Sequence, residues 1–346
     1  MSDSHLFDHV ALAAQVKRQR KYAWDLDKGV QWSLGVDTTL PFLPLDSQSI
    51  ACPGASQEQR LALSQLVGLI INSTISEMES VITKLRRVAW AEPLREFSVN
   101  PEMWELGDLF FIEENKHALA FNRFNQLFCQ TEGIDPEQLD RLLPKAFGSL
   151  FLKAVIANAK SGGHAFWWIV AAVEEVSLSL FQDIHRVRDS IDPLYYEVHK
   201  KHMEEEKRHH NYAFLMLELI ERRSFSLKRL LHRKTDLLFG QLFSSGWVLG
   251  ELNKIFLAES MTNDHPFFQV IASCLPLMRQ LTIPELMSRL FVSAPYVSLV
   301  LNTKNHRLTS RMAITHRAFN FPFPDPNITP LAPPEPTERP LKKKYG

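Results

Sequence analysis

Apolar residues recur every three or four positions through long windows of the chain, which is the pattern of amphipathic α-helices. Four windows are long enough for helices of about 25 residues or more, the size used in helical bundles. They run from about 57 to 88, from 101 to 129, from 164 to a stop before Asp192-Pro193, and from 193 to near 223. Asn100-Pro101 is a helix start signal and Gly162-Gly163 is a helix breaker. The pattern predicts an all-α fold organised around a helical bundle.

The segments outside these windows predict one main domain with an extension at each end. Residues 1–56 are mixed in pattern and end in a Pro-containing stretch, so we expect an irregular or partly helical N-terminal extension. Residues 57–305 are the predicted main domain, in which the segment after 225 adds further helices to the bundle. Residues 306–346 are rich in proline, which favours an extended or disordered tail.

The composition argues against several classes of partner. The 346 residues include 39 basic and 39 acidic side chains, and 45% of them are hydrophobic. A neutral chain lacks the basic excess that nucleic acids and anionic membranes call for, so we expect neither partner. The three cysteines are widely separated, and the sequence begins without the apolar run of a signal peptide. No apolar run approaches the ~18 residues of a membrane span, so the expected location is the reducing cytoplasm.

The stretch HMEEEKRHH, residues 202–210, is crowded with groups that either bind metal or form a solvated helix face. On an α-helix, His202, Glu206 and His209 fall within an arc of roughly 60°, so two imidazoles and a carboxylate face one point. His199 lies at the edge of this face and His210 points away, so neither is a predicted ligand. A charge run taken alone usually faces water. The choice between a metal-binding face and a solvated face therefore depends on the residues of the other predicted helices.

The second long window carries a matching pair in the stretch FFIEENKHALAF. Glu114 and His117 lie three residues apart on one helix face, in apolar surroundings where an unpaired charge is costly. Glu206 and His209 repeat this spacing in the fourth window. Two Glu-x-x-His pairs, with a single Glu on each of two further helices, hold two metal ions in a four-helix bundle. This coincidence favours the metal-binding interpretation of residues 202–210.

Candidates for the single carboxylates occur in the other two windows. The third window contains Glu174 and Glu175 within IVAAVEEVSLSLF, where no cation lies within a helical turn. The first window contains Glu77 and Glu79, of which Glu77 lies closer to the centre of the apolar stripe. The helical pattern alone leaves both choices open.

These residues resemble the p-aminobenzoate N-oxygenases and related di-iron arylamine oxygenases. The match rests on His-x-x-Glu-Glu-x-Arg-His at 202–209, on Glu114-x-x-His117 and on the single carboxylates, and it covers about residues 60 to 220. Family spacing places one single Glu 27 residues before His202 and the other 35 residues before Glu114, which favours Glu175 and Glu79. The ligand set implied by the resemblance is Glu79, Glu114, His117, Glu175, His202, Glu206 and His209.

The resemblance implies a ferritin-like four-helix bundle with additional helices, a di-iron centre, and N-oxygenation of a small amine with O2 and an external electron donor. A possible homodimer is also expected. Four carboxylates would balance two Fe(II) ions, and manganese suits the same donors. Asp183, Glu205 and Arg208 are candidates to orient the imidazoles from behind.

Other functions remain open at this stage. They are a non-catalytic ferritin-like iron-binding protein and a di-iron oxidase that acts on a substrate other than an amine. A radical-generating subunit like that of ribonucleotide reductase would keep a Tyr four residues after His117, where this chain has Phe121. A zinc protease would need two histidines four apart with a Glu beside the first, and the chain has no such run.

Overall fold

The computed structural model describes residues 9–45, 54–97, 99–143, 149–223, 265–278 and 280. Every regular element in these ranges is helical, so the prediction of an all-α fold is confirmed. The N-terminal half contains α1 (His9–Tyr22), the 3-10 turn η1 (Trp32–Leu34), α2 (Gln57–Arg86), the π-helical turn η2 (Arg87–Ala91), α3 (Glu92–Phe97) and α4 (Pro101–Glu132). It is followed by α5 (Pro136–Leu142), α6 (Ser149–Lys160), α7 (Ala165–Arg186), α8 (Pro193–Arg223) and α10 (Pro266–Met278).

The long helices begin and end where local chemistry favours it. Ser56 caps α2 in a capping box with Gln59, in which each side chain bonds the other residue's backbone N–H. Helix α4 starts with Pro101 in its first turn and ends at Gly133, whose φ of 73° is favourable for glycine. Asp192 Oδ1 accepts the backbone N–H of Tyr195 at 2.6 Å and so caps the start of α8. The predicted helix boundaries therefore lie within a few residues of those observed.

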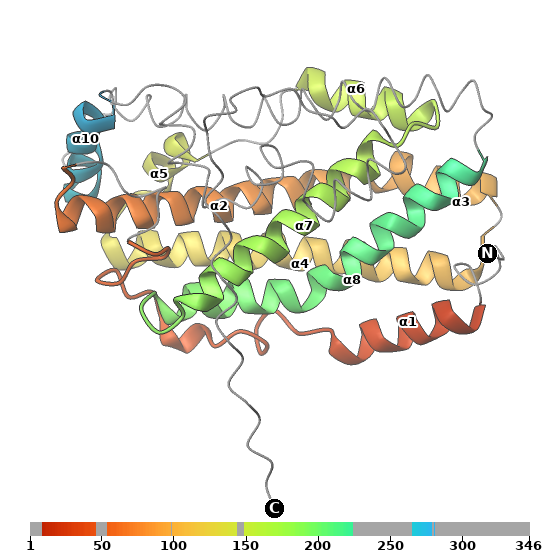
Figure 1. Cartoon of the computed structure of the whole chain (residues 1–346), viewed down its shortest axis with the longest axis horizontal. Coiled ribbons are helices and arrows are strands. Elements are labelled where there is room, and N and C mark those ends of the chain that lie inside the picture. The colour runs from red at the N-terminus through yellow and green to blue at the C-terminus, as the bar shows by residue number, and fades with distance from the viewer. Residues whose placement is uncertain are drawn as a thin grey trace, which may run out of the picture.

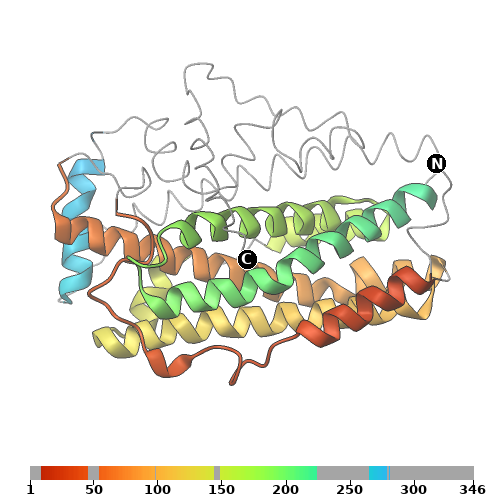
Figure 2. The same ribbon diagram turned by 60° about the horizontal axis from the view of Figure 1, so that its bottom comes forward.

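Four long helices lie side by side and form the body of the described part (Figures 1 and 2). Helix α2 packs against α4, α7 packs against α8, and α4 joins the two pairs through α8. The coloured ribbon shows that the chain reverses direction from α2 to α4 and again from α7 to α8, whereas α4 and α7 run the same way (Figure 1). The connection that contains α5 and α6 therefore returns the chain along the length of the bundle.

The N-terminal segment packs along the outside of this body. Helix α1 contacts α4 and α8, and the chain after it continues along the same side (Figure 2). Phe42 is fully buried against Tyr195 of α8, with ring centroids 5.1 Å apart. Residue Gly68 of α2 leaves room for this contact, because a Cβ there would lie 2.7 Å from that of Phe42. The expected irregular or partly helical extension is thus, over most of its described length, helix α1 followed by a connecting segment, residues 23–45, that contains η1.

Two apolar clusters fill the interior and leave a band of polar residues between them. One contains Phe121, Phe124 and Tyr195. The other contains Phe110, Trp167 and Tyr212. One continuous helical stretch, Gln57–Arg95, is long and apolar enough to cross a membrane, with a window of mean hydropathy 1.3 that is 78% buried inside the protein. Its apolar residues face the other helices, which accounts for its composition without a membrane.

Several predictions concern segments beyond the described ranges. The helices expected after 225 fall there except for α10, which packs against α2. The proline-rich tail at 306–346 falls there entirely. The division of the chain at residues 56 and 305 therefore stays a prediction.

Candidate metal centre

Four helices each bring acidic or imidazole side chains to the middle of the molecule. Two groups of four residues hold their nitrogen and oxygen atoms within 4.8 Å of one another, close enough to hold a metal ion. The first group is Glu79 of α2, His117 of α4, and His202 and Glu206 of α8. The second group is Glu114 of α4, Glu174 of α7, and Glu206 and His209 of α8. Glu206 belongs to both, so the two groups are neighbours that share one carboxylate.

All seven residues are buried, since none of them exceeds 3% exposure. Charged side chains are almost never buried this deeply unless they are paired or bind a metal. Buried charges in a cluster therefore need a cation or a set of protons to balance them.

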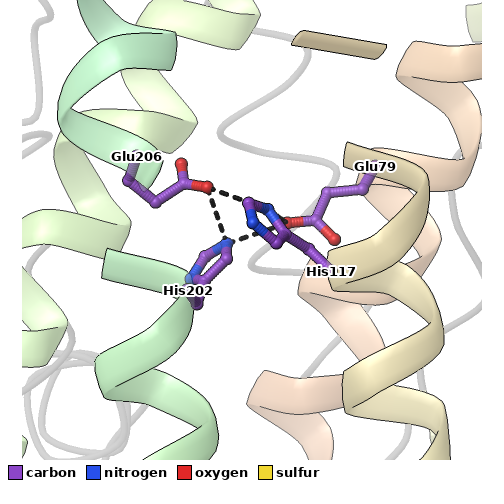
Figure 3. Close-up of side chains that lie close together, drawn as sticks. All are labelled: Glu79, His117, His202 and Glu206. Atoms are coloured by element: carbon purple, nitrogen blue, oxygen red, sulfur yellow. Dashed lines mark hydrogen bonds and ion pairs between the residues drawn. The ribbon is translucent and has the colours of Figure 1, made fainter. Parts of the chain in front are cut away.

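The first group is held by short contacts to two imidazoles (Figure 3). His202 Nε2 lies 2.9 Å from Glu79 Oε1 and 2.9 Å from Glu206 Oε1. His117 Nδ1 lies 3.2 Å from Glu206 Oε1 and 3.6 Å from Glu79 Oε1. The two carboxylates approach from opposite sides with the imidazoles between them (Figure 3). The four ligand atoms thus face a common point.

The second group repeats the arrangement with one imidazole. His209 Nδ1 lies 2.8 Å from Glu114 Oε1 and 3.4 Å from Glu206 Oε1. Glu174, which is 1% exposed, completes this group from α7. The first group therefore has two carboxylates and two imidazoles, and the second has three carboxylates and one imidazole.

Several of these atoms are close together without forming hydrogen bonds. Within the described part of the chain, His117 Nδ1, His209 Nδ1 and Glu206 Oε1 have no hydrogen-bond partner despite the short distances. The same holds for Glu79 Oε2 and Glu114 Oε1. Buried polar atoms are nearly always hydrogen-bonded. His202 Nε2 and Glu79 Oε1 do form a hydrogen bond, at 2.9 Å, but the unpartnered atoms leave several lone pairs that converge, which is the donor arrangement that a cation requires.

Two further carboxylates hold the imidazoles from behind. Glu205 Oε2 accepts a hydrogen bond from His117 Nε2 at 2.7 Å, and Glu113 Oε2 accepts one from His209 Nε2 at 2.8 Å. A carboxylate can only accept, so each neutral imidazole carries its proton on Nε2 and turns the Nδ1 lone pair toward the cluster. The support is reciprocal, because α8 provides the partner for the histidine of α4 and α4 provides the partner for the histidine of α8.

Cations on the same two helices balance the outer carboxylates. Lys116 Nζ lies 2.7 Å from Glu205 Oε1. Arg208 NH2 lies 3.5 Å from Glu205 Oε1 and 3.5 Å from Glu113 Oε1, so it stands between the two. Burial opposes ionisation of Glu205, but its contacts with His117 and Lys116 outweigh it and lower its pKa to about 2, so this carboxylate is charged and able to accept from the imidazole.

The N-terminal segment closes the outside of the centre. Gln19 of α1 donates from Nε2 to Glu113 Oε2 at 2.8 Å. The backbone N–H of Trp24 donates to Glu205 Oε1 at 3.3 Å, and Lys116 Nζ donates to the Trp24 carbonyl at 2.9 Å. The indole of Trp24 stacks on the His117 ring, with centroids 5.8 Å apart. Residues far apart in sequence thus complete the layer around the imidazoles.

Burial and mutual contact shift the pKa values within the cluster in both directions. Burial raises the pKa of Glu79 and of Glu114 above the ordinary value of 4.5, and neighbouring carboxylates add to this effect. Burial opposes protonation of His117 and His209, but the surrounding carboxylates outweigh it and raise the pKa of both imidazoles above 6.5. These carboxylates include Glu206, whose own pKa falls to about 2 because the two imidazoles outweigh its burial. Without a metal ion, protons take the place of cations in the cluster.

These shifts predict how the stability of the metal-free protein depends on pH. Glu79, Glu114, His117 and His209 bind protons more tightly in the folded chain than in the unfolded chain, so rising pH removes stability. The loss begins above pH 4.5 for the carboxyls and above 6.5 for the imidazoles, and it continues toward the raised pKa values.

Bound metal replaces those protons, so the difference in melting temperature between metal-loaded and metal-free protein should widen from about pH 6 to about pH 9. Thermal denaturation of both forms across this range measures the difference. A gap that stays constant would mean that the cluster does not exchange protons for metal.

The outer carboxylate Glu113 offers a second test, because it bonds the ring of His209 but belongs to neither group of candidate ligands. We expect Glu113→Leu to weaken metal binding by about 10- to 100-fold, since His209 loses the partner that orients its ring. Metal titration under anaerobic conditions measures the change. Glu132→Gln at the far end of α4 is the control and should bind as the wild type does. Equal affinity in Glu113→Leu and wild type would exclude an orienting role.

The structure brings together six of the seven residues implied by the sequence, namely Glu79, Glu114, His117, His202, Glu206 and His209. From α7, the second group contains Glu174, whereas the side chain of Glu175 lies outside the described part of the chain. The preference for Glu175 as a ligand therefore stays a prediction. Glu77 is half-buried and belongs to neither group.

The residues treated as non-ligands lie outside both groups. His199 is bonded through Nε2 to Asn72 Oδ1 at 3.0 Å, and the ring of His210 lies beside Phe214. Among the expected outer partners, Glu205 contacts His117 directly, and Arg208 contacts Glu205. Asp183 instead pairs with Arg186 on its own helix. Glu113, Gln19 and Trp24 were not predicted.

A comparison of the chain with models of protein families, with curated proteins and with solved structures found no match. The structure shows a helical protein with buried carboxylate and imidazole groups that could hold metal.

Proposed function

We propose that the chain is an O2-dependent di-iron oxygenase with a ferritin-like four-helix bundle, and that α2, α4, α7 and α8 are the bundle helices. The observation that carries the proposal is the pair of buried groups that share Glu206, in which His117 Nδ1, Glu206 Oε1 and His209 Nδ1 converge without a hydrogen-bond partner in the described part of the chain. The directions of the four helices, with one long connection between α4 and α7, agree with a bundle that has a single crossover.

The charge of the donor set supports two divalent ions. Glu79, Glu114, Glu174 and Glu206 are four carboxylates, and three imidazoles add neutral donors. Two Fe(II) ions would balance the four negative charges, and manganese would fit the same ligands. All-thiolate sites are excluded for these groups, because carboxylates and imidazoles make up both of them. Iron in this ligand set would supply the reduction of O2.

The surrounding side chains suit a reaction that must be shielded from water. The Phe121 ring packs edge-on against His202 at 4.9 Å, and the Phe110 ring packs edge-on against His209 at 4.8 Å. The two apolar clusters thus close the centre at both ends. Excluding water strengthens the electrostatic interactions in the site and prevents wasteful side reactions.

The overall reaction requires reducing equivalents from outside. One oxygen atom of O2 is inserted into the substrate, and the other leaves as water after taking up two electrons and two protons. The chain therefore needs an external electron donor, a small organic substrate and O2. The resemblance to the p-aminobenzoate N-oxygenases makes an arylamine the substrate class that we propose.

The test is reaction of protein loaded anaerobically with Fe(II). After exposure to labelled oxygen gas and p-aminobenzoate with a chemical reductant, mass spectrometry should find label on the amine nitrogen. Iron uptake should stop at about two ions per chain, the capacity of one such site. Continued uptake of many ions without oxygenated product would indicate iron storage instead. Oxygenation of a compound that is not an amine would keep the enzyme class and replace the substrate.

A further inference from the structure

The outward face of α1 carries an uncompensated positive charge. Lys17, Arg18 and Lys21 are exposed on the side of the helix opposite Leu12 and Val16, which are buried. Lys28 follows them in the connecting segment after α1 and is also exposed. Among the described residues, these four cations form no ion pair with a carboxylate. We refer to them together as the α1 basic patch.

Few carboxylates are available to balance these cations. Asp27 pairs with Arg123 at 2.8 Å, and Asp25, whose Oδ1 accepts the backbone N–H groups of Asp27 and Lys28, is the one other carboxylate between residues 17 and 28, against the four cations of the patch. Arg20, the fifth cation of this segment, pairs with Glu105. The whole chain has no net charge, and several unpaired cations on one helix face create a local positive field there.

The patch adjoins a partly exposed residue that contacts the metal centre. Trp24 follows Lys21 by three residues, is half-buried, and stacks on His117, a residue of the first group. Lys116 lies over the same indole at 4.2 Å and pairs with Glu205, which bonds His117. One aromatic side chain thus separates this surface from a ligand imidazole.

We propose that the α1 basic patch is the docking surface of an acidic one-electron carrier protein that reduces the metal centre. This proposal rests on the proposed function, because only a redox site needs such a partner. Each encounter oxidises the carrier by one electron and reduces the centre by one electron, and two encounters supply the two electrons of the reaction. Charge complementarity identifies the occupant as acidic, and the stacked Trp24 explains why it docks here.

An encounter of this type should be steered by charge and sensitive to salt. Electron-carrier complexes are small and transient, and complementary charges chiefly raise their association rate. The complex should therefore weaken as ionic strength increases, because exposed charges are screened over about 10 Å at 0.1 M salt. A chemical reductant of small size would bypass the patch.

The experiment compares two triple variants with the wild type. Lys17→Glu, Arg18→Glu, Lys21→Glu reverses the patch, and Arg141→Glu, Lys153→Glu, Lys160→Glu reverses three exposed cations on α5 and α6, far from α1 in Figure 1. The probe is a reduced plant-type ferredoxin, and the readouts are its dissociation constant from the protein and the rate of its oxidation at low and high salt. Iron content and melting temperature show whether each variant is intact.

The expected result at low salt is a dissociation constant raised, and a rate of ferredoxin oxidation lowered, by about tenfold or more in the α1 variant, with both values unchanged in the control variant. Reduction by dithionite should be equal in all three proteins. Equal ferredoxin binding by the α1 variant and wild type would overturn the docking proposal, while retained iron would leave the di-iron proposal standing. Loss of iron from wild type would contradict the proposed function instead. Binding of anionic vesicles in place of ferredoxin would assign the patch to a membrane surface and also overturn the proposal.

Discussion

Glu206→Gln should abolish stable iron binding in both halves of the centre. Glu206 is the one residue that belongs to both groups, and its Oε1 lies 2.9 Å from His202 Nε2 and 3.4 Å from His209 Nδ1. The substitution preserves shape but removes one of four negative charges and the shared oxygen. We therefore expect iron content to fall from about two ions per chain to near zero.

Iron analysis after anaerobic loading and desalting measures this effect. Glu204→Gln is the matched control, because Glu204 lies two residues away on α8 with its side chain 38% exposed and paired with Lys201. The control should keep its iron. Full retention of iron in Glu206→Gln would show that this carboxylate is not shared by two ions.

His202→Ala should separate iron binding from productive oxygen chemistry. His202 contributes a neutral donor, so its loss leaves the charge balance of the remaining ligands unchanged, and iron should stay bound with lower affinity. Its ring also packs against Phe121 at 4.9 Å and His117 at 4.6 Å, so the substitution opens a space beside the centre. Water that enters this space should compete with the substrate.

The variant should therefore still consume O2 but release most of it as hydrogen peroxide, with product formation reduced much more than iron content. Parallel assays of oxygen, peroxide and product measure the coupling. His199→Ala, which removes a buried imidazole one turn earlier that bonds Asn72, controls for the cavity itself. Coupling in His202→Ala equal to that of wild type would argue that His202 does not act as a ligand.

Spacing within one helix was sufficient to predict which residues of α4 and α8 meet. Glu114 and His117 share a face because they are three residues apart, and the same holds for Glu206 and His209. His202, four residues before Glu206, belongs to that face as well. The shared face within each helix depends only on helix geometry, whereas the match between the two helices was needed to predict that these faces bind metal.

The helical pattern could not predict the ligand on a helix with two neighbouring candidate carboxylates. Glu174 and Glu175 differ by about 100° in direction, and only the contacts of α7 with its neighbours decide which of them faces the centre. Glu174 is in the second group. On α2, Glu77 lies closer to the centre of the apolar stripe, so the helical pattern left the choice open and only the family spacing favoured Glu79, which the structure buries in the first group. Polar residues line the helix face that meets a polar site, so an apolar stripe is a poor guide there.

The outer layer was the least predictable part of the centre. One signal was present, since each ligand Glu of the two pairs is directly preceded by another Glu, at Glu113 and Glu205. Gln19 and Trp24 carried no such signal, because their roles follow from how the N-terminal segment crosses α4 and α8. Contacts between segments that are distant in sequence depend on tertiary packing, which local patterns do not encode.

We propose that two metal ions occupy the middle of the helical body and that Glu206 contributes to both sites. Anomalous diffraction at the iron absorption edge, from crystals of protein loaded anaerobically with Fe(II), would locate these ions. We expect two peaks, one among Glu79, His117, His202 and Glu206 and the other among Glu114, Glu174, Glu206 and His209. A single peak, no peak, or peaks away from these two groups would contradict it.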